Sequence, residues 1–328
     1  MNIGVVVGGY SDESVISIRS GQLILKNLDP DKYTVYEVRI LPEGWYVLAN
    51  DSKYDIDKSD FSFVKDDKKI QFDIAINTIH GTPGEDGHLQ AYWELIGLNY
   101  TGCGFYQSAL TFNKRDTLSV LNKFDIPKAK SIYLSKGDAI TATEVIATLG
   151  LPFMVKPNQS GSSLGISKVN NPEEFDAALQ KAFKEDSDVL IEAYIKGVEV
   201  SVGVLNFKGE TTVLGITEII SHNDFFDYEA KYEGKSDEIT PARIDKTTED
   251  RVRQTAIKAY EALGMSGFTR SEFIIMEGVP YFIEMNTNPG LSPQSIFPQQ
   301  AQHAGIPFAE LLESEIQLAQ KRKVLWKK

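Results

Sequence analysis

The sequence predicts an α/β protein of three domains, the first of which is built on an open parallel sheet. The chain has 328 residues, enough for two or three domains with separate cores. Short apolar runs typical of buried parallel strands, such as 3–7, alternate with amphipathic helical segments, such as 16–25. Glycine turns close these units near residues 102 and 197. The expected domains are therefore 1–102, 103–196 and 197–328.

The composition is typical of a soluble globular protein and argues against several classes of function. Hydrophobic residues make up 42% of the chain and charged residues 24%. No apolar run approaches the roughly 20 residues of a membrane span, and Met1 leads into a predicted strand without a basic leader. The single cysteine, Cys103, cannot form an internal disulfide, which indicates a reducing, cytoplasmic location. The net charge of −12 argues against a nucleic-acid partner, so an anionic ligand would need lysines and arginines gathered in a cleft.

Two loops of the first domain carry candidate ligand groups. Glu13 lies at the turn between the strand 3–7 and the following helix, where it could bind a substrate ammonium or simply stabilise the first helical turn. The second loop, 79–87, follows the apolar strand 72–77 and contains three glycines and a proline. Open α/β sheets bind ligands at the carboxyl ends of their strands, which makes His80 a candidate. A hydrogen-bonded loop histidine would have the same pattern.

Two lysines and a loop rich in glycine and serine suit phosphate groups in the second domain. Lys114 lies in a partly apolar helical stretch, so it should have an anionic partner, and Lys156 lies in the apolar strand 152–157. The loop 158–168 follows this strand, and its backbone amides and hydroxyl groups are suited to covering phosphates. A further strand directly after the loop would make it a flexible flap.

The same loop contains a motif of a different class of enzyme. Gly161-Ser162-Ser163-Leu164-Gly165 matches the Gly-x-Ser-x-Gly nucleophile elbow of serine hydrolases. That elbow requires a helix immediately after the serine, whereas residues 166–169 have a strand pattern and the next helix is expected after Pro172. A serine hydrolase that uses Ser163 is therefore the alternative reading, and covalent labelling by an electrophilic phosphonate would detect it.

The third domain begins at an expected hinge, 196–197, and contains a long polar segment. Glu192, before the hinge, and Glu199, after it, are either nucleotide ligands or solvated strand ends. The segment 221–240 has no apolar periodicity and is expected to be a surface loop that serves as a lid. Its aromatic stretch at 225–232 indicates more than a simple connection.

A predicted hairpin of the strands 267–276 and 279–286 carries the densest cluster of polar candidates. Period-2 alternation and cross-strand pairing should gather these side chains on one face. They are Arg270, Glu272, Glu284 and Asn286. Two carboxylates and an amide on rigid strands suit Mg²⁺, which takes oxygen ligands and completes its shell with phosphate oxygens. The hairpin ends at 288–290, Asn-Pro-Gly, where backbone N–H groups can approach an anion; a plain polar strand end and turn is the alternative.

The chain resembles the D-alanine–D-alanine ligases of the ATP-grasp superfamily over essentially its whole length. Each matching motif is weak alone, but their joint order is highly specific. The matching positions are 8–13, 80–87, Lys114, 155–157, 161–165, 227–232, Arg270 and 284–290. The resemblance implies the three-domain ATP-grasp architecture, with ATP between the second and third domains and a lid at 221–240.

The resemblance also implies roles for individual residues. ATP would be bound by Lys114, Lys156, Gly161, Ser162, Ser163, Glu192, Glu199 and Lys231. Two Mg²⁺ ions, for which Mn²⁺ can substitute, would be held by Glu272, Glu284 and Asn286. D-Alanine would be bound by Glu13, His80, Arg270, Gly290 and Ser295. Catalysis would depend on Glu13, Ser162, Tyr232, Arg270, Gly290 and Ser295.

The implied reaction is ATP-dependent ligation of two D-alanines into D-alanyl-D-alanine for peptidoglycan precursors. The carboxylate of the first D-alanine attacks the γ-phosphate, and the amine of the second attacks the resulting acyl phosphate. D-Alanine and ATP are the expected partners, and the family suggests a homodimer. Ligases that add D-lactate or D-serine are alternatives within the family, and a non-catalytic homologue would bind ATP without releasing phosphate.

Three positions depart from the pattern of the family. Glu272 replaces an expected aspartate, so one carboxylate at the metal site is a methylene longer. Val15 stands where many relatives have a second acidic residue, and Phe226 lacks a hydroxyl found in some lids. None of the three removes a group that the chemistry requires.

Overall fold

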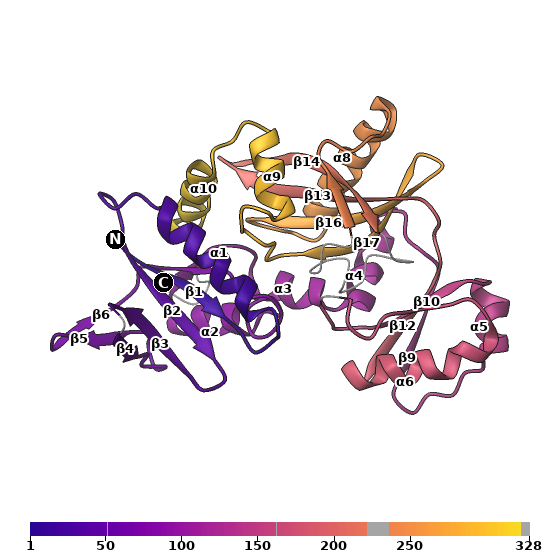
Figure 1. Ribbon diagram of the computed structural model, residues 1–328, viewed down its shortest axis with the longest axis horizontal. Coiled ribbons are helices and arrows are strands. Elements are labelled where there is room, and N and C mark those ends of the chain that lie inside the picture. The colour runs from indigo at the N-terminus through magenta and orange to yellow at the C-terminus, as the bar shows by residue number, and fades with distance from the viewer. Residues whose placement is uncertain (51, 162, 222–235, 323–328) are drawn as a thin grey trace.

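The computed structural model describes residues 1–50, 52–161, 163–221 and 236–322. Its strands form three large sheets, of six, four and five strands in chain order, and helices pack against each of them (Figure 1). This arrangement confirms the predicted α/β class. A small ribbon of β5 (Phe63–Lys65) and β6 (Lys68–Ile70) lies beside the first sheet.

The first sheet has the strand order β4-β3-β2-β1-β7-β8. Strand β1 is parallel to both of its neighbours and β7 is parallel to β8, whereas β3 and β4 extend the sheet by antiparallel pairs. The predicted open sheet is thus mostly parallel with an antiparallel edge. The elements besides β5 and β6 are β1 (Asn2–Gly8), α1 (Ser14–Asn27), β2 (Thr34–Leu41), β3 (Gly44–Ala49), β4 (Ser52–Asp55), β7 (Ile74–Asn77), α2 (His88–Ile96) and β8 (Asn99–Tyr100).

Strand β1 is buried on both faces, which explains its continuous apolar run. Val5 and Val7 pack with α1 and with the C-terminal helix α10 (Phe308–Gln320), while Val6 packs on the opposite face with α2. The strand ends at Gly8, where φ is +105° and an added Cβ would lie 2.5 Å from the Ile40 carbonyl oxygen. Only glycine fits there, and the chain then turns into the loop that carries Glu13.

The second sheet is antiparallel, with the order β11-β10-β12-β9. Helices α5 and α6 cover one face, where Phe153 and Val155 are part of a closed apolar core. Met154 and Lys156 alternate with them and therefore point to the other face. The elements are α3 (Phe105–Phe112), α4 (Lys114–Leu121), the 3₁₀ turn η1 (Asn122–Phe124), β9 (Ser131–Ser135), α5 (Ala142–Leu149), β10 (Phe153–Pro157), β11 (Ser167–Val169), the 3₁₀ turn η2 (Pro172–Glu174), α6 (Phe175–Glu185) and β12 (Asp188–Ala193).

The third sheet is antiparallel, with the order β15-β14-β13-β16-β17. Val200 and Val202 of β13 pack against α8, so the intervening Ser201 points to the opposite face, which carries the polar cluster. Gln300 of α9 donates a hydrogen bond of 2.8 Å to the Ser201 carbonyl oxygen and holds that helix on the sheet. The remaining elements are β13 (Val198–Phe207), β14 (Glu210–Ser221), β15 (Ser236–Ile239), α8 (Lys246–Ala262), β16 (Thr269–Met276), β17 (Val279–Asn286) and α9 (Ile296–His303).

The predicted lid segment 221–240 needs a correction at its end. Residues 236–239 form strand β15, which pairs antiparallel with the end of β14 and so belongs to the sheet. The residues 222–235 lie outside the described part of the chain. Among the described residues, none of the helices is long and apolar enough to cross a membrane.

Candidate active site

The pairing of β16 and β17 brings the four polar residues of the predicted hairpin together. Glu272 lies directly opposite Glu284, and Arg270 lies opposite Asn286. The Arg270 guanidinium donates a hydrogen bond of 3.1 Å to the hydroxyl of Ser201 and a second, short one to the Glu272 carboxylate. The predicted convergence on one face is confirmed. The register shifts just beyond Glu272, where the apolar residues of the hairpin begin to pair.

Charges of opposite sign stabilise the arginine in this cluster. Burial alone lowers the pKa of the Arg270 guanidinium, but the negative charges of Glu272, Glu284 and Glu238 outweigh it and raise the pKa above its ordinary value. Glu238 lies on β15 and was not predicted to contribute. The guanidinium therefore remains a fixed positive charge at the centre of an acidic face.

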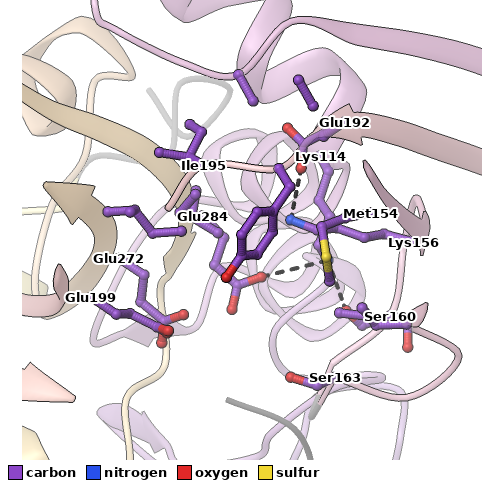
Figure 2. A pocket seen from close by; sticks show the side chains of 16 residues that line it. Lys114, Met154, Lys156, Ser160, Ser163, Glu192, Ile195, Glu199, Glu272 and Glu284 are labelled. Carbon is purple, nitrogen blue, oxygen red and sulfur yellow. Dashed lines mark hydrogen bonds and ion pairs between the residues drawn. The ribbon is translucent and has the colours of Figure 1, made fainter. Parts of the chain in front are cut away.

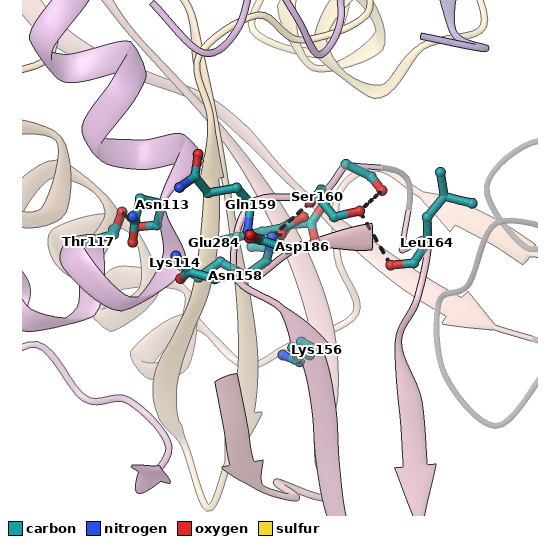
Figure 3. A network of polar contacts seen from close by, with 12 residues as sticks. Asn113, Lys114, Thr117, Lys156, Asn158, Gln159, Ser160, Leu164, Asp186 and Glu284 are labelled. Atoms are coloured by element: carbon teal, nitrogen blue, oxygen red, sulfur yellow. Dashed lines mark hydrogen bonds and ion pairs between the residues drawn. The ribbon is translucent and has the colours of Figure 1, made fainter. Parts of the chain in front are cut away.

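Both predicted phosphate lysines are buried and have anionic partners. Lys114 begins α4, and its ammonium donates to the Ser160 carbonyl oxygen at 2.9 Å and lies 3.7 Å from the Glu284 carboxylate (Figure 3). Lys156 of β10 lies 2.7 Å from Glu192 on the adjacent strand β12. Burial lowers the pKa of Lys156, but the Glu192 charge outweighs this effect, so the pKa is raised. The expectation of an anionic partner for Lys114 is confirmed.

A cavity of about 100 Å³ lies between the second and third sheets (Figure 2). One part of its wall is apolar and is formed by Ala129, Met154, Ile195, Ile274 and Ile283. The polar part contains seven predicted site residues, Lys114, Lys156, Ser163, Glu192, Glu199, Glu272 and Glu284. Glu192 is only 3% exposed, and within the described part of the chain its Oε1 atom has no hydrogen-bond partner, although Oε2 accepts from Lys156. This buried oxygen is therefore available to a hydrogen-bond donor that enters the cavity.

A second cavity of about 70 Å³ adjoins the first. Lys114, Ser160 and Glu284 line both cavities, so the Lys114–Glu284 pair lies in the wall between them. The residues that line only the second include the predicted Glu13, Gly161, Arg270 and Asn286. Glu85 also lines it, and the sequence reasoning assigned this carboxylate no role although it lies in the quoted loop motif.

The loop between β10 and β11 has the strand–loop–strand form of a flap. Strand β11 follows the loop, and α6 begins only at Phe175, so the context of a nucleophile elbow is absent from the described residues here. The serine-hydrolase reading is therefore wrong, because the described residues that directly follow Ser163 do not form the helix that a nucleophile elbow requires. An added Cβ at Gly161 would lie 3.4 Å from the Glu13 carboxylate, so the loop lies against the N-terminal domain. The Ser160 hydroxyl lies 3.4 Å from the Leu164 carbonyl oxygen and closes the loop (Figure 3).

The remaining described candidates, His80, Gly290 and Ser295, are not among the residues that line the two cavities. His80 is buried, and burial lowers the pKa of its imidazole against the opposing charge of Glu13. The side chain of Asn288 donates to the Ile79 carbonyl oxygen at 2.7 Å, which joins the His80 loop to the turn after β17. In that turn an added Cβ at Gly290 would lie 2.8 Å from the Ser295 hydroxyl, so the two residues are in close contact.

Three predicted residues, Ser162, Lys231 and Tyr232, lie outside the described part of the chain. Their proposed link between flap and lid therefore stays a prediction. The structure does add apolar residues that sequence reasoning missed, because Met154, Ile195 and Ile283 look like ordinary strand interior in the sequence. The two-residue spacing of Met154 and Lys156 on β10, which puts both side chains on one face, is the signal that could have revealed Met154.

Comparisons with known proteins agree with this geometry. The family model described as "D-ala D-ala ligase N-terminus" matches residues 2–103, and the one described as "D-ala D-ala ligase C-terminus" matches residues 120–317. The chain belongs to the D-alanine–D-alanine ligase family. Within this family it is 66% identical to the D-alanine–D-alanine ligase of Flavobacterium psychrophilum over 328 residues, which covers both chains completely. It is 54% identical to that of Flavobacterium johnsoniae over 97% of this chain and 99% of the relative.

Solved structures of the family have the same fold. The VanG D-Ala:D-Ser ligase from Enterococcus faecalis superposes with a TM-score of 0.88 at 31% identity, covering 97% of this chain and 99% of that one. The D-alanine–D-alanine ligase from Bacillus anthracis, complexed with ATP, superposes with a TM-score of 0.78 at 29% identity, covering 97% of each chain. The predicted family and ATP-grasp fold are confirmed.

Proposed function

We propose that this chain joins two D-alanines into D-alanyl-D-alanine, with conversion of ATP to ADP and phosphate. The observation that carries the proposal is the position of Lys114 and Glu284 between two adjacent cavities. One cavity has an apolar wall and buried charges suited to a nucleotide, and the other has acids and an arginine suited to amino acids. A phosphoryl group could pass between them at this shared wall.

The larger cavity is the proposed ATP site. Its apolar wall suits an adenine ring. Oε1 of Glu192, which has no hydrogen-bond partner among the residues that the structure describes, would accept a hydrogen bond from the exocyclic amine. Lys156 is paired with Glu192, so it would lie near the adenine end of the nucleotide and away from the γ-phosphate. Lys114 lies at the opposite, shared wall and would contact the γ-phosphate. Gly161 and Ser163 of the flap would cover the phosphates.

The acidic face suits Mg²⁺ only when phosphate is present. Glu272, Glu284 and Asn286 would hold the ions, and two of the three are cross-strand neighbours. Among the described residues there is no group of three His, Cys, Asp or Glu side chains placed to hold a metal. A set of two carboxylates and an amide fits an ion that takes its other ligands from ATP and water. When bound, the ions would neutralise the charge that develops on the transferring phosphoryl group.

The smaller cavity is the proposed amino-acid site. Glu13 would bind the ammonium of the first D-alanine, and Arg270 would stabilise the oxyanion of the tetrahedral intermediate. His80, neutral because of its burial, would contact the first D-alanine, while Gly290 and Ser295 would hold the carboxylate of the second. Ser162, Lys231 and Tyr232 would join flap and lid, excluding water that would hydrolyse the acyl phosphate.

The proposal is tested by measuring phosphate release from ATP together with dipeptide formation, with and without D-alanine and with and without Mg²⁺. D-Alanyl-D-alanine and phosphate should appear in equal amounts only when all three components are present. Phosphate release without dipeptide, or nucleotide binding without phosphate release, would overturn the proposal.

The structural similarity to a D-Ala:D-Ser ligase makes D-alanyl-D-serine the competing product to consider. We propose D-alanyl-D-alanine as the main product at neutral pH, because the more similar relatives bear that name. Product analysis with D-alanine, D-serine and D-lactate together separates the three activities.

We further propose domains at 1–102, 103–196 and 197–328, which limited proteolysis would test. We also propose a homodimer, which analytical sedimentation would test.

A further inference from the structure

Glu85 is a carboxylate fixed at the wall of the amino-acid cavity. Its backbone N–H donates to the Gly81 carbonyl oxygen at 2.7 Å, and its Oε2 accepts from the Gly81 N–H at 2.9 Å. An added Cβ at Gly84 would lie 2.5 Å from the Cβ of Ile79, so the residue before Glu85 packs closely against the start of the same loop. The side chain is thereby held toward the cavity that Glu13 and Arg270 also line.

Burial and neighbouring negative charges raise the pKa of Glu85. Burial is the largest cause and the charge of Glu13 the next, and together with Glu284 they raise the pKa of Glu85 to about 7. The Gly81 N–H and the Lys114 ammonium act in the opposite direction. Arg270 is a further cation on the cavity wall. With this pKa, Glu85 exchanges a proton near neutral pH, whereas a glutamate with the ordinary pKa of 4.5 is ionised there.

The proposed ligation creates a need for such a group. The second D-alanine arrives mainly as an ammonium ion, which has no lone pair for attack on the acyl phosphate. A base is most effective when its pKa lies near the working pH, and it must lie beside the reacting atoms. Among the described residues, three carboxylates line this cavity, Glu13, Glu85 and Glu284. Glu13 is proposed to hold the first ammonium and Glu284 a metal ion, which leaves Glu85 as the base.

We infer that Glu85 accepts a proton from the ammonium of the second D-alanine, an assignment that rests on the proposed ligase function. Of the three ammonium protons, one passes to Glu85, one stays on the amide nitrogen and one leaves with the phosphate. The nitrogen lone pair forms the C–N bond to give the tetrahedral intermediate, and the C–O bond to phosphate then breaks, giving dipeptide, hydrogen phosphate and protonated Glu85. The protonated carboxyl returns its proton to water after product release.

The test compares two nucleophiles in the full-length protein. Hydroxylamine is largely uncharged at neutral pH, so it can trap the acyl phosphate as D-alanine hydroxamate without a protein base. Glu85→Gln should keep hydroxamate formation within about threefold but lose about 10²-fold or more in dipeptide formation at pH 7. Its dipeptide rate should rise about tenfold per pH unit above 7, as free amine accumulates, whereas the wild-type rate should level off. Glu85→Asp should restore part of the dipeptide rate.

Asp86→Asn is the matched control, since Asp86 is the next residue of the loop and does not line the cavity. It should keep both reactions and both pH profiles. Equal loss of both reactions in Glu85→Gln, or an unchanged dipeptide rate and pH profile, would overturn the inference. Failure of the wild type to form hydroxamate would instead overturn the proposed function.

Discussion

Arg270 and Glu272 lie two residues apart on β16, and the guanidinium of Arg270 donates a hydrogen bond to the Glu272 carboxylate. Both side chains point to the same face of the sheet, which makes this contact possible. Glu272 is the position where the family pattern has an aspartate. The additional methylene lets the carboxylate reach toward the arginine, so the guanidinium would compete for this carboxylate with the metal ion proposed for this face.

We therefore expect Glu272→Asp to bind metal more tightly. An aspartate cannot reach Arg270 as easily, and the ion would no longer compete with the guanidinium for the carboxylate. Mn²⁺ affinity in the presence of ADP should rise by about fivefold to tenfold, on the order of 1 kcal/mol. Titration calorimetry of wild type and variant measures this. Unchanged or weaker binding would show that the arginine contact does not limit metal binding.

Loss of the Glu284 charge should abolish ligation without unfolding the protein. Glu284 faces Glu272 across the hairpin and lies 3.7 Å from the Lys114 ammonium. Glu284→Gln therefore removes the negative charge between Lys114 and the proposed Mg²⁺ ions. The dipeptide rate should fall at least about 10²-fold, equivalent to about 2.7 kcal/mol in the barrier. Glu277→Gln, in the exposed turn of the same hairpin, is the control and should stay active. A folded Glu284→Gln protein with near-normal turnover would disprove the metal assignment.

Ser163 should prove dispensable for chemistry. It lines the nucleotide cavity with a φ of +58°, and a strand rather than a helix follows its loop. Ser163→Ala should keep activity within about threefold, because no acyl-enzyme forms on this hydroxyl. Ser162→Ala should lose more, since Ser162 is the position that matches the flap–lid contact of the family. Covalent labelling of Ser163 by a phosphonate, or the reverse order of the two variants, would restore the hydrolase reading.

The site was more predictable from sequence than the packing around it. Glu284 and Asn286 alternate on a strand bounded by clear turns, so their common face follows from period 2 alone. The apolar stripe of α10, by contrast, does not indicate which surface the helix covers. In the structure α10 packs against β1 of the first sheet, about 300 residues earlier in the chain. The boundary between α3 and α4 was not predicted either; it lies at Asn113, which adopts an extended conformation and caps α4. Contacts between distant segments decide such features, and local patterns do not encode them.

The last prediction concerns Glu315, a second buried carboxylate, which lies on α10 at the junction with the N-terminal domain. It is 3% exposed, and its Oε2 accepts a hydrogen bond of 3.1 Å from the Gly102 N–H, while Oε1 has no partner among residues 1–322 as far as the structure describes them. Burial raises the pKa of Glu315 to about 7, although the Gly102 N–H and the Arg322 charge oppose this shift. Between the ordinary carboxyl pKa of 4.5 and this raised value, the folded protein therefore keeps the Glu315 carboxyl protonated, whereas the unfolded chain ionises it.

The sign of the stability effect follows from this difference. Below the ordinary carboxyl pKa of 4.5 the group is protonated in both states, and as the pH rises toward about 7 only the unfolded state loses the proton. The wild type should therefore lose up to about 3 kcal/mol of unfolding free energy over this range from Glu315 alone. Glu315→Gln should remove this loss, because a glutamine can still accept from Gly102. Urea unfolding of both proteins at pH 5 and pH 8, with the exposed Glu261→Gln as control, measures the difference. Parallel pH dependence of wild type and Glu315→Gln would show that Glu315 is already ionised in the folded protein, and that the junction between α10 and the first domain is wet rather than closed.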